Sequence, residues 1–408
     1  MTNKQGSAPG QGQLGQEQQH EVLIYNAKIV TEQGVWDNAM LHVKDGNIAL
    51  LDEHNDIDAV KLSSGAQQID AKGSWLLPGF IDVHVHGGYG ADFMDSNKEI
   101  LDTITGFHVK YGTTGMLATS MTAPKADLDR VLAEVNSYMQ TDMPYAQLLG
   151  VHLEGPFISH KWPGAQNPNF IAPPQVEWLE EWHQLYPQLM KQLTLAPERE
   201  GALEVIAWLR DHGIVAACGH TDSSYADIQA AANEGLTHAV HTFNAMKALH
   251  HREPGTVGAV LTDERISAEV IADGLHVHPA AIRLLTQVKQ QQNLLLITDA
   301  MSAAGLGDGD YELGGLPVVV KNGEARLKEG NSLAGSTLTM IDALRFVVRE
   351  VGVSVEAASR YASGNPAKLL RMDDRLGSIA KGKQADLILV SPELEIERVW
   401  IRGSEIVG

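Results

Sequence analysis

Short apolar runs recur along the middle of the chain, and each one stops at a cluster of polar residues. The eight runs are 76–86, 112–120, 147–155, 193–198, 214–221, 237–246, 266–274 and 293–301. Continuous Val, Ile, Leu and Ala residues over so short a length are typical of strands buried on both faces. Segments of helix-forming composition separate most runs, so the pattern predicts parallel strands joined by helical crossovers.

Eight strand and helix units in succession predict an α/β fold, a (β/α)8 TIM-like barrel. A doubly wound open sheet is the alternative, but no G-x-G-x-x-G sequence opens a helix after the first run. A further segment, 338–371, has helical periodicity with a break at Gly364-Asn365-Pro366, where a new helix should begin. In a barrel of this type the chemistry lies at the carboxyl ends of the strands, so polar residues at run ends are candidates.

The two ends of the chain have a different pattern. Residues 21–75 and 376–408 alternate apolar and polar positions between turn signals, as hairpin strands do. Neither segment is long enough to bury a sheet well alone, so we expect both to form one small β-sandwich domain. This leaves 76–375 as the catalytic barrel and the Gln- and Gly-rich residues 1–20 as a disordered leader.

Composition and charge narrow the class of protein. The 408 residues are 44% hydrophobic, enough for a large core, and carry a formal net charge of −20. Nucleic acids and anionic membranes need a basic surface, so we expect neither as a partner. The single Cys218 excludes internal disulfides and suits a reducing compartment. We therefore expect a cytoplasmic enzyme in which Cys218 packs as a small apolar residue in the fifth barrel strand.

The first run ends in His84-Val85-His86. In a strand, residues two apart lie on the same face, so both imidazoles would point the same way. Imidazole is the commonest ligand for zinc and also suits iron, so the pair indicates a metal site. The alternative is that both histidines fill a layer of the barrel interior.

Three further runs end in metal-ligand types: Glu154 after the third, His220 after the fifth and His241 after the sixth. Alone, Glu154 could cap a neighbouring helix. Together, the three would hold a divalent metal and leave positions open for water, as a catalytic metal requires. Asp299, after the eighth run, could accept a proton from metal-activated water and return it to a leaving amine. Its alternative role is a helix N-cap.

Eight motifs occur in order along the chain: PGFIDVHVHG, HLEGPF, GHT, HTFNAM, REPG, ADGLHVHP, TDAM and LAGSTLTM. Together they closely resemble those of the N-acetylglucosamine-6-phosphate deacetylases of the amidohydrolase superfamily, over residues 22–408. The first motif marks only the superfamily, whereas HLEGPF, HTFNAM and ADGLHVHP are much narrower. The substrate assignment rests on this resemblance, because periodicity and spacing alone indicate only a metal-dependent hydrolase on a barrel.

The resemblance implies that Glu154, His220 and His241 hold the main metal ion and that Asp299 is the general acid and base. The His-x-His pair would allow a second ion, giving one or two ions per subunit. Some members of the family lack this pair and work with one metal. Zinc is our first choice for nitrogen and oxygen ligands, with iron, cobalt and manganese as alternatives.

The resemblance also implies a set of substrate-binding residues. They are Ala165, Asn244, Ala245, Arg252, His276, Leu333, Ala334 and Gly335. Arg252 and His276 would supply the positive charge that a phosphate needs. Arg252 would reach the site of a neighbouring subunit, since similar enzymes are dimers, so we expect a homodimer. One departure is Gln166, which stands where the family usually has histidine and which cannot be charged.

The expected reaction is metal-assisted hydrolysis of the acetamide of N-acetyl-D-glucosamine 6-phosphate to D-glucosamine 6-phosphate and acetate. Because of Gln166, another N-acetylhexosamine phosphate, such as N-acetylgalactosamine 6-phosphate, is an alternative substrate. An amidohydrolase for a different N-acyl or cyclic amide would share the metal residues without needing Arg252 and His276. A non-enzymatic metal-binding protein on this scaffold would have no reason to keep Asp299.

Overall fold

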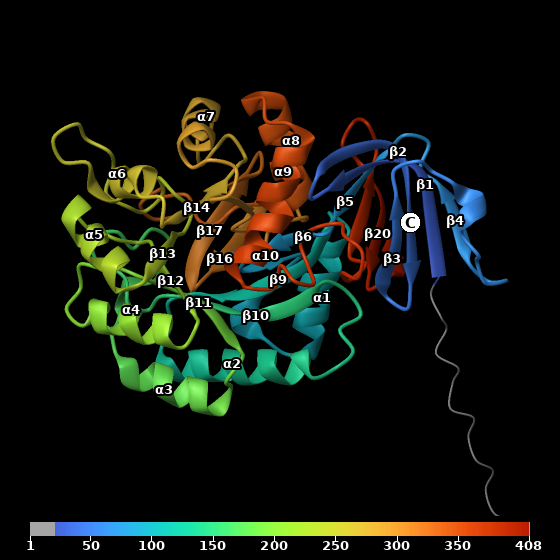
Figure 1. Ribbon diagram of the computed structural model, residues 1–408. Coiled ribbons are helices and arrows are strands. Elements are labelled where there is room, and N and C mark those ends of the chain that lie inside the picture. Colours follow the sequence, from blue (N-terminus) through green and yellow to red (C-terminus); the bar gives the residue numbers. More distant parts are fainter. Residues whose placement is uncertain (1–20, 408) are drawn as a thin grey trace, which may run out of the picture.

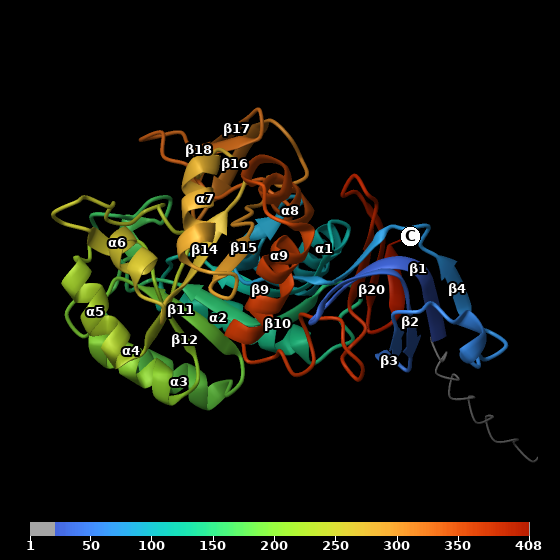
Figure 2. The same ribbon diagram turned by 45° about the horizontal axis from the view of Figure 1, so that its top comes forward.

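The computed structural model describes residues 21–407, so the leader predicted over 1–20 lies outside the described residues. Two parts lie side by side in Figures 1 and 2: a barrel of strands surrounded by helices, and a sheet made by both ends of the chain. The predicted combination of a (β/α)8 barrel and a small β-domain from the chain ends is therefore confirmed.

Eight parallel strands form the barrel, and each strand after the first pairs with the barrel strand before it. They are β6 (Phe80–Asp82), β9 (Thr113–Ser120), β10 (Gln147–Glu154), β11 (Met190–Leu195), β12 (Val215–Cys218), β13 (Leu236–Ala239), β14 (Ser267–Ile271) and β15 (Leu294–Ile297). Beyond the ends of β15 and β6, backbone hydrogen bonds of 2.8 Å run from Asp299 N to His84 O and from His86 N to Ala300 O. The segments that carry the candidate residues are thereby fixed to one another. Cys218 is buried in β12, the fifth barrel strand, as predicted.

Helices surround the barrel in Figure 1. Those between the barrel strands are α1 (Lys98–Val109), α2 (Lys125–Met139), α3 (Val176–Leu185), α4 (Ala202–Asp211), α5 (Tyr225–Glu234), α6 (Gly255–Thr262) and α7 (Pro279–Val288). Short 3-10 turns are η1 (Ile57–Ala59), η2 (Phe93–Asp95) and η3 (Pro168–Phe170). The segment predicted to be helical over 338–371 contains α8 (Met340–Phe346), π-helix η4 (Val347–Val351), α9 (Val355–Ser359), π-helix η5 (Arg360–Gly364) and α10 (Asn365–Leu369). The predicted break at Gly364-Asn365-Pro366 is wrong: Gly364 and Asn365 have helical backbone, so the chain continues from η5 into α10, and only the hydrogen-bond pattern changes there.

The terminal sheet joins strands from both ends of the chain in one hydrogen-bonded network. Its strands are β1 (Glu21–Thr31), β2 (Gly34–Lys44), β3 (Asn47–Asp52), β4 (Gln67–Asp70), β5 (Trp75–Pro78), β19 (Leu387–Val390), β20 (Ile396–Ile401) and β21 (Ser404–Val407). Alternate residues of these strands, such as Ile24, Leu41 and Leu387, build a hydrophobic core separate from that of the barrel. The alternation of apolar and polar residues at the two chain ends therefore correctly predicted strands there.

The first predicted strand, 76–86, is divided between the two parts. Its beginning belongs to β5, which pairs with β1 and β19 in the terminal sheet, and the barrel strand β6 starts at Phe80. The chain crosses between the sheets at Gly79, where a Cβ would lie only 2.1 Å from Thr114 Oγ1. A residue without a side chain is therefore required at the crossing.

A three-stranded antiparallel sheet that the sequence pattern did not predict follows β15. It consists of β16 (Gly309–Leu313), β17 (Leu316–Lys321) and β18 (Glu324–Leu327). Its buried side chains pack against Met121 and Met301, beside the strand ends. A short hairpin, β7 (Gly87–Gly88) with β8 (Ala91–Asp92), follows the His-x-His pair. Among the helices of residues 21–407, none has the length and apolar character that crossing a membrane requires.

Candidate metal centre and active site

A cavity of about 440 Å³ opens at the carboxyl ends of the barrel strands. Most of the predicted site residues line it: His86, Glu154, Ala165, His220, His241, Asn244, Ala245, His276, Asp299, Leu333 and Gly335. His84 is fully buried and contacts Glu154 and Asp299 from within the protein. Ala334 is also fully buried and, like Arg252, does not line the cavity. Residues from six barrel strand ends therefore meet at one place, as expected for this fold.

Four imidazole nitrogens converge on the carboxylate of Glu154. Nε2 of His220 and Nε2 of His241 lie 3.2 and 3.0 Å from Glu154 Oε1. His84 Nε2 lies 3.3 Å from the same oxygen, and His86 Nε2 lies 3.2 Å from Oε2. Burial alone would raise the pKa of Glu154, but the facing His84 and His220 hold that pKa well below its ordinary value. The carboxylate is therefore ionised.

The spacing of these atoms fits a metal ion. Zinc binds imidazole nitrogen at about 2.0–2.1 Å in tetrahedral geometry, which places neighbouring ligand atoms about 3.4 Å apart. One group of ligand atoms, from His84, Glu154 and His241, lies within 4.8 Å of one another, and so does a second, from His84, His86 and Asp299. Nε2 of His84 is a buried ring nitrogen without a hydrogen-bond partner. A divalent cation would satisfy that nitrogen, so the residues fit one or two ions.

Three of the candidate residues have strained backbone at the ends of their strands. His220, His241 and Asp299 have φ angles of 46°, 29° and 51°. A positive φ is unfavourable for a residue with a Cβ, and such residues cluster at functional sites where the surroundings hold them in place. Around Asp299, hydrogen bonds from its own N–H to His84 O and from Ser336 N to its carbonyl fix the conformation at 2.8 and 2.7 Å. The fold therefore fixes the direction of the Asp299 side chain.

The Asp299 carboxylate lies between the histidine pair and the cavity. Its Oδ1 is 3.2 Å from His86 Nε2 and 3.7 Å from His84 Nε2. Burial alone would raise the pKa of Asp299, but the hydrogen bond from His86 and the charges of both histidines lower it below its ordinary value. Asp299 is therefore ionised near neutral pH and is able to accept a proton.

Gln166, the residue that departs from the family motif, is hydrogen-bonded to Glu154, a candidate metal ligand. Its amide nitrogen donates to Glu154 Oε2 at 2.5 Å, and its Oε1 accepts a hydrogen bond from Thr122 N at 2.6 Å. Gln166 is almost fully buried but still lines the cavity wall. It therefore orients the oxygen of Glu154 that faces His86.

Glu269, in the middle of β14, was not predicted as a site residue. Its carboxylate is fully buried and accepts hydrogen bonds from His84 Nδ1 at 2.9 Å and His238 Nε2 at 2.8 Å. The Gln192 amide and the backbone N–H of His241 also donate to it, each at 3.2 Å. A bond to Nδ1 leaves Nε2 of His84 as the nitrogen that faces Glu154. In the sequence, the feature that could have identified Glu269 is that it is a charged residue inside an apolar run.

The cavity wall also offers positive charge from two further side chains. His276 Nδ1 lies 2.6 Å from Asp273 Oδ2, and although burial opposes the charged form, this bond raises the pKa of His276. Lys161 is the one Lys or Arg side chain among the described residues that line the cavity, and it pairs with Asp222 at 2.8 Å. Arg252 is exposed on the loop between β13 and α6, where it contacts His251. Within one chain, His276 and Lys161 therefore offer positive charge to the cavity in addition to the histidines that face Glu154 and Asp299.

Comparison with known proteins gives the family. Residues 75–406 match the Amidohydrolase family. An N-acetylglucosamine-6-phosphate deacetylase from Bacillus subtilis (strain 168) is 40% identical over 387 residues, which are 94% of this chain and 96% of the relative. An N-acetylgalactosamine-6-phosphate deacetylase from Escherichia coli O157:H7 is 37% identical over 92% of this chain and 97% of the relative.

A solved structure agrees with these matches. It is a mutant of the N-acetyl-D-glucosamine-6-phosphate deacetylase from Mycobacterium smegmatis in complex with N-acetyl-D-glucosamine-6-phosphate. Its TM-score with this chain is 0.87 at 31% identity, and the match covers 95% of this chain and all of the other. The chain therefore belongs to the amidohydrolase family and, within it, to the N-acetylglucosamine-6-phosphate deacetylases.

Proposed function

We propose that this chain removes the acetyl group from N-acetyl-D-glucosamine 6-phosphate, releasing D-glucosamine 6-phosphate and acetate. The observation that carries the proposal is the ionised Asp299, which faces the cavity beside the ligand types that converge on Glu154. The names of the relatives supply the substrate. A second substrate, N-acetylgalactosamine 6-phosphate, is supported by the relative from Escherichia coli O157:H7.

Enzymes of the amidohydrolase superfamily depend on metals, and this chain has residues suited to hold them. Glu154, His220 and His241 would hold the main ion, and His84 and His86 would hold a second. A bound divalent metal would lower the pKa of water toward about 7 and polarise the acetamide carbonyl. Zinc is the proposed metal because the ligands are imidazole nitrogens and a carboxylate, with iron, cobalt or manganese as alternatives.

Asp299 is proposed to act first as a base and then as an acid. Its carboxylate accepts a proton from the water as the water oxygen forms a bond to the acetamide carbonyl carbon. It then delivers that proton to the amide nitrogen as the C–N bond breaks, so the amine leaves without a negative charge and acetate remains. The side chain of Asp299 is only 11% exposed, which limits exchange of this proton with bulk water.

Positive side chains in the cavity are proposed to bind the phosphate. His276 and Lys161 lie in the cavity of the same chain. Arg252 lies outside it, on a loop that also exposes Leu249, so we propose that Arg252 completes the cavity of a second subunit in a homodimer. Asn244, Ala245, Ala165 and residues 333–335 would contact the sugar and the acetyl group.

A cytoplasmic location is also proposed, supported by the single buried thiol of Cys218. The division into a β-domain, 21–75 with 376–408, and a catalytic barrel, 76–375, is supported by the two separate hydrophobic cores.

Acetate release from three sugars tests the proposal: N-acetylglucosamine 6-phosphate, N-acetylgalactosamine 6-phosphate and unphosphorylated N-acetylglucosamine. We expect the first to be preferred over the last by at least about tenfold in kcat/KM, since a charge-assisted contact contributes about 1.5–3 kcal/mol. Preference for the galactosamine derivative would change the substrate but keep the reaction. Preference for the unphosphorylated sugar would contradict the assignment of the phosphate.

A further inference from the structure

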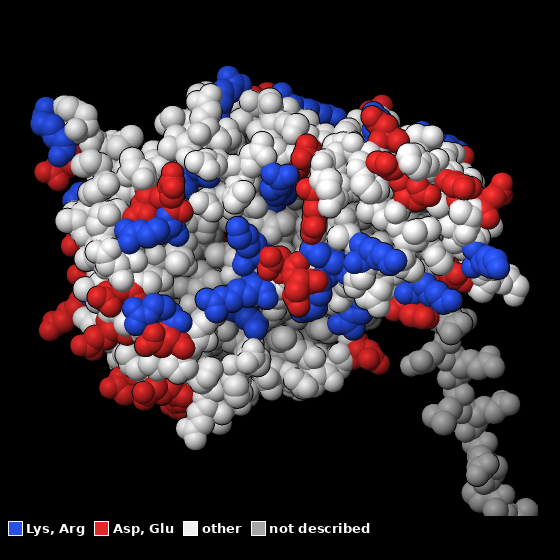
Figure 3. Space-filling model, in the orientation of Figure 1, with Lys and Arg blue, Asp and Glu red and all other residues white. Residues whose placement is uncertain are grey.

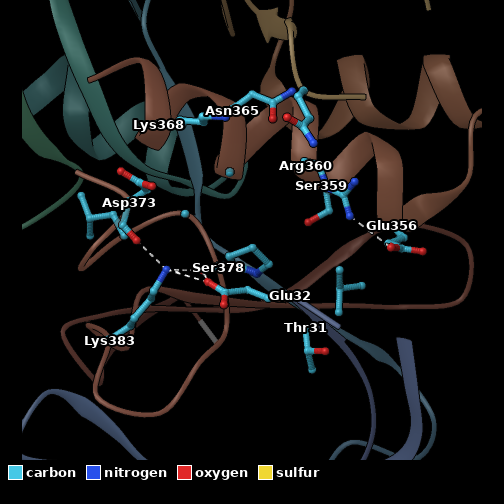
Figure 4. Close-up of a pocket in the computed structure, with 16 residues that line it drawn as sticks. Thr31, Glu32, Glu356, Ser359, Arg360, Asn365, Lys368, Asp373, Ser378 and Lys383 are labelled. Atoms are coloured by element: carbon cyan, nitrogen blue, oxygen red, sulfur yellow. Dashed lines mark hydrogen bonds and ion pairs between the residues drawn. The ribbon is translucent and has the colours of Figure 1, made fainter. Parts of the chain in front are cut away.

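Two adjoining hollows lie at the other end of the barrel from the candidate active site. The first, of about 500 Å³, lies between the terminal sheet and the segment that contains η5 and α10, as Figure 4 shows. The second, of about 270 Å³, lies at the amino ends of β12 to β15. Gln292, Asn365 and Lys368 line both hollows, so Lys368 stands at the junction between them.

The first hollow is polar, and four of its six charged side chains form two ion pairs, whereas Asp373 and Lys368 form none among residues 21–407. Lys383 Nζ lies 2.8 Å from Glu32 Oε1, and Arg360 lies 3.2 Å from Glu356. Hydroxyl groups come from Thr31, Ser359 and Ser378. Figure 4 shows these side chains around the hollow, with Lys368 and Asn365 on the opposite side from Lys383. A lining of hydroxyls and mostly paired charges suits the hydroxyl-bearing part of a ligand.

The second hollow is cationic. Its lining includes Arg210, Arg265, Lys368 and Arg371 and no acidic residue. Arg210 and Arg265 pair with acids outside the lining. No carboxylate oxygen of residues 21–407 lies within 4.0 Å, the limit for an ion pair, of the side-chain nitrogens of Lys368 or Arg371. Two exposed cations without counter-ions among residues 21–407 therefore line the second hollow, and one of them, Lys368, also lines the first.

The second hollow is locally cationic although the protein carries a net charge of −20. Figure 3 shows Lys and Arg side chains gathered near the middle of the face that carries α10, beside a smaller group of acids. Further along the same end of the barrel, the pKa of Lys191 is lowered by burial and by the positive charge of Arg375. Like charges held close together without acids favour an anion between or beside them.

The wall of the hollows is fixed before any ligand arrives. The Asn365 side chain donates to Gln291 O at 2.9 Å and to Leu294 O at 2.7 Å, which ties α10 to the start of β15. The preceding turn, η5, is a π-helix, a form that often occurs at functional sites. Preformed walls reduce the ordering that a ligand must impose on binding.

We propose that the two hollows form a second ligand site for a phosphorylated, hydroxyl-rich small molecule of the sugar-phosphate class. The phosphate binds Lys368 and Arg371, and the hydroxyl-bearing part occupies the first hollow. The site is distinct from the candidate active site, because it lies at the amino ends of the barrel strands. Binding here does not depend on the reaction proposed above.

Hydrogen exchange with glucose 6-phosphate as the probe, and glucose as the uncharged comparison, locates the binding. Glucose 6-phosphate should protect segments 359–371 and 213–215, and glucose should not. The variant Lys368→Gln/Arg371→Gln removes two charges at exposed positions and should fold normally. Its affinity for the probe, measured by calorimetry, should fall at least about tenfold. Lys61→Gln/Lys72→Gln removes the same charge from exposed positions near the terminal sheet and should bind as the wild type does.

Three results would overturn the proposal. Protection confined to the segments around the candidate active site would mean that the phosphate binds only there. Unchanged affinity in Lys368→Gln/Arg371→Gln would remove both cations from the site. Equal losses in the two double variants would show that only the overall charge attracts the probe.

Discussion

Replacing Glu269 by Gln is expected to weaken metal binding although Glu269 would not touch the metal. Four N–H groups donate to this carboxylate, from His84, His238, Gln192 and the backbone of His241. A carboxylate has about four lone-pair positions, so the donors match it in number. The amide of Gln has one acceptor oxygen and one donor nitrogen, so at least one of the four donors would face another donor.

The position of the Gln amide decides which ring nitrogen is affected. If its NH2 group faces His84 Nδ1, that nitrogen must accept, and the proton moves to Nε2, the atom that faces Glu154. If it faces His238 instead, a buried donor is left unpaired at a cost of about 1–3 kcal/mol. Loss of such an outer partner typically lowers metal affinity by about 10–100-fold.

Competition with a chromogenic chelator would measure zinc affinity in Glu269→Gln and in the control Glu264→Gln. Glu264 is exposed and precedes β14, so the control makes the same change of charge outside the network. We expect a loss of about 10–100-fold for Glu269→Gln and none for the control. Equal affinities in the two variants and the wild type would refute the assigned role of Glu269.

Three further predictions concern single side chains. Asp299→Asn should keep the metal and lose turnover by about 10²–10⁴-fold, because the amide cannot accept the proton; more than about a tenth of wild-type turnover would exclude the base role. Arg252→Ala should lower kcat/KM by about 10–150-fold for the phosphorylated sugar only, and equal losses on the unphosphorylated sugar would make Arg252 structural. Burial lowers the pKa of His108 from 6.5 to about 4, so the unfolded chain binds the extra proton as the pH falls between these values. The stability to urea should therefore decrease by about 3 kcal/mol from pH 6.5 to pH 4, and His108→Gln, which still has a donor for Gly87 O, should flatten this slope. An unchanged slope would show that another group titrates.

The barrel could be predicted because strands buried on both faces produce continuous apolar runs. The apolar run at 76–86 did not reveal that it contains two strands of different sheets. Both β5 and β6 are buried, and only Gly79 lies between them. The sheet of β16 to β18 was missed because the residues of β17 are alternately exposed and buried but Val occupies both kinds of position, so the sequence shows no apolar and polar alternation there. Apolar runs reveal burial, but not which sheet a strand joins.

For the candidate site, the sequence pattern pointed to some of the residues that meet at the cavity and missed others. His220, His241 and Asp299 stood out because polar residues at the ends of apolar runs meet at one end of a barrel. Glu269 did not, because it lies inside a run, and its role appears only when His84 and His238 are seen to converge on it. A role for Arg252 could not be tested with one chain, since Arg252 is exposed and does not line the cavity of its own chain.

The most direct measurement for the central claim is acetate release from N-acetylglucosamine 6-phosphate by protein stripped of metal and then reloaded. The account predicts no release from stripped protein whose metal content has been measured as negligible. It predicts recovery when zinc returns at one or two ions per chain, and no recovery in Asp299→Asn with the same zinc content. Undiminished acetate release from stripped wild-type protein would contradict metal-dependent deacetylation at this cavity.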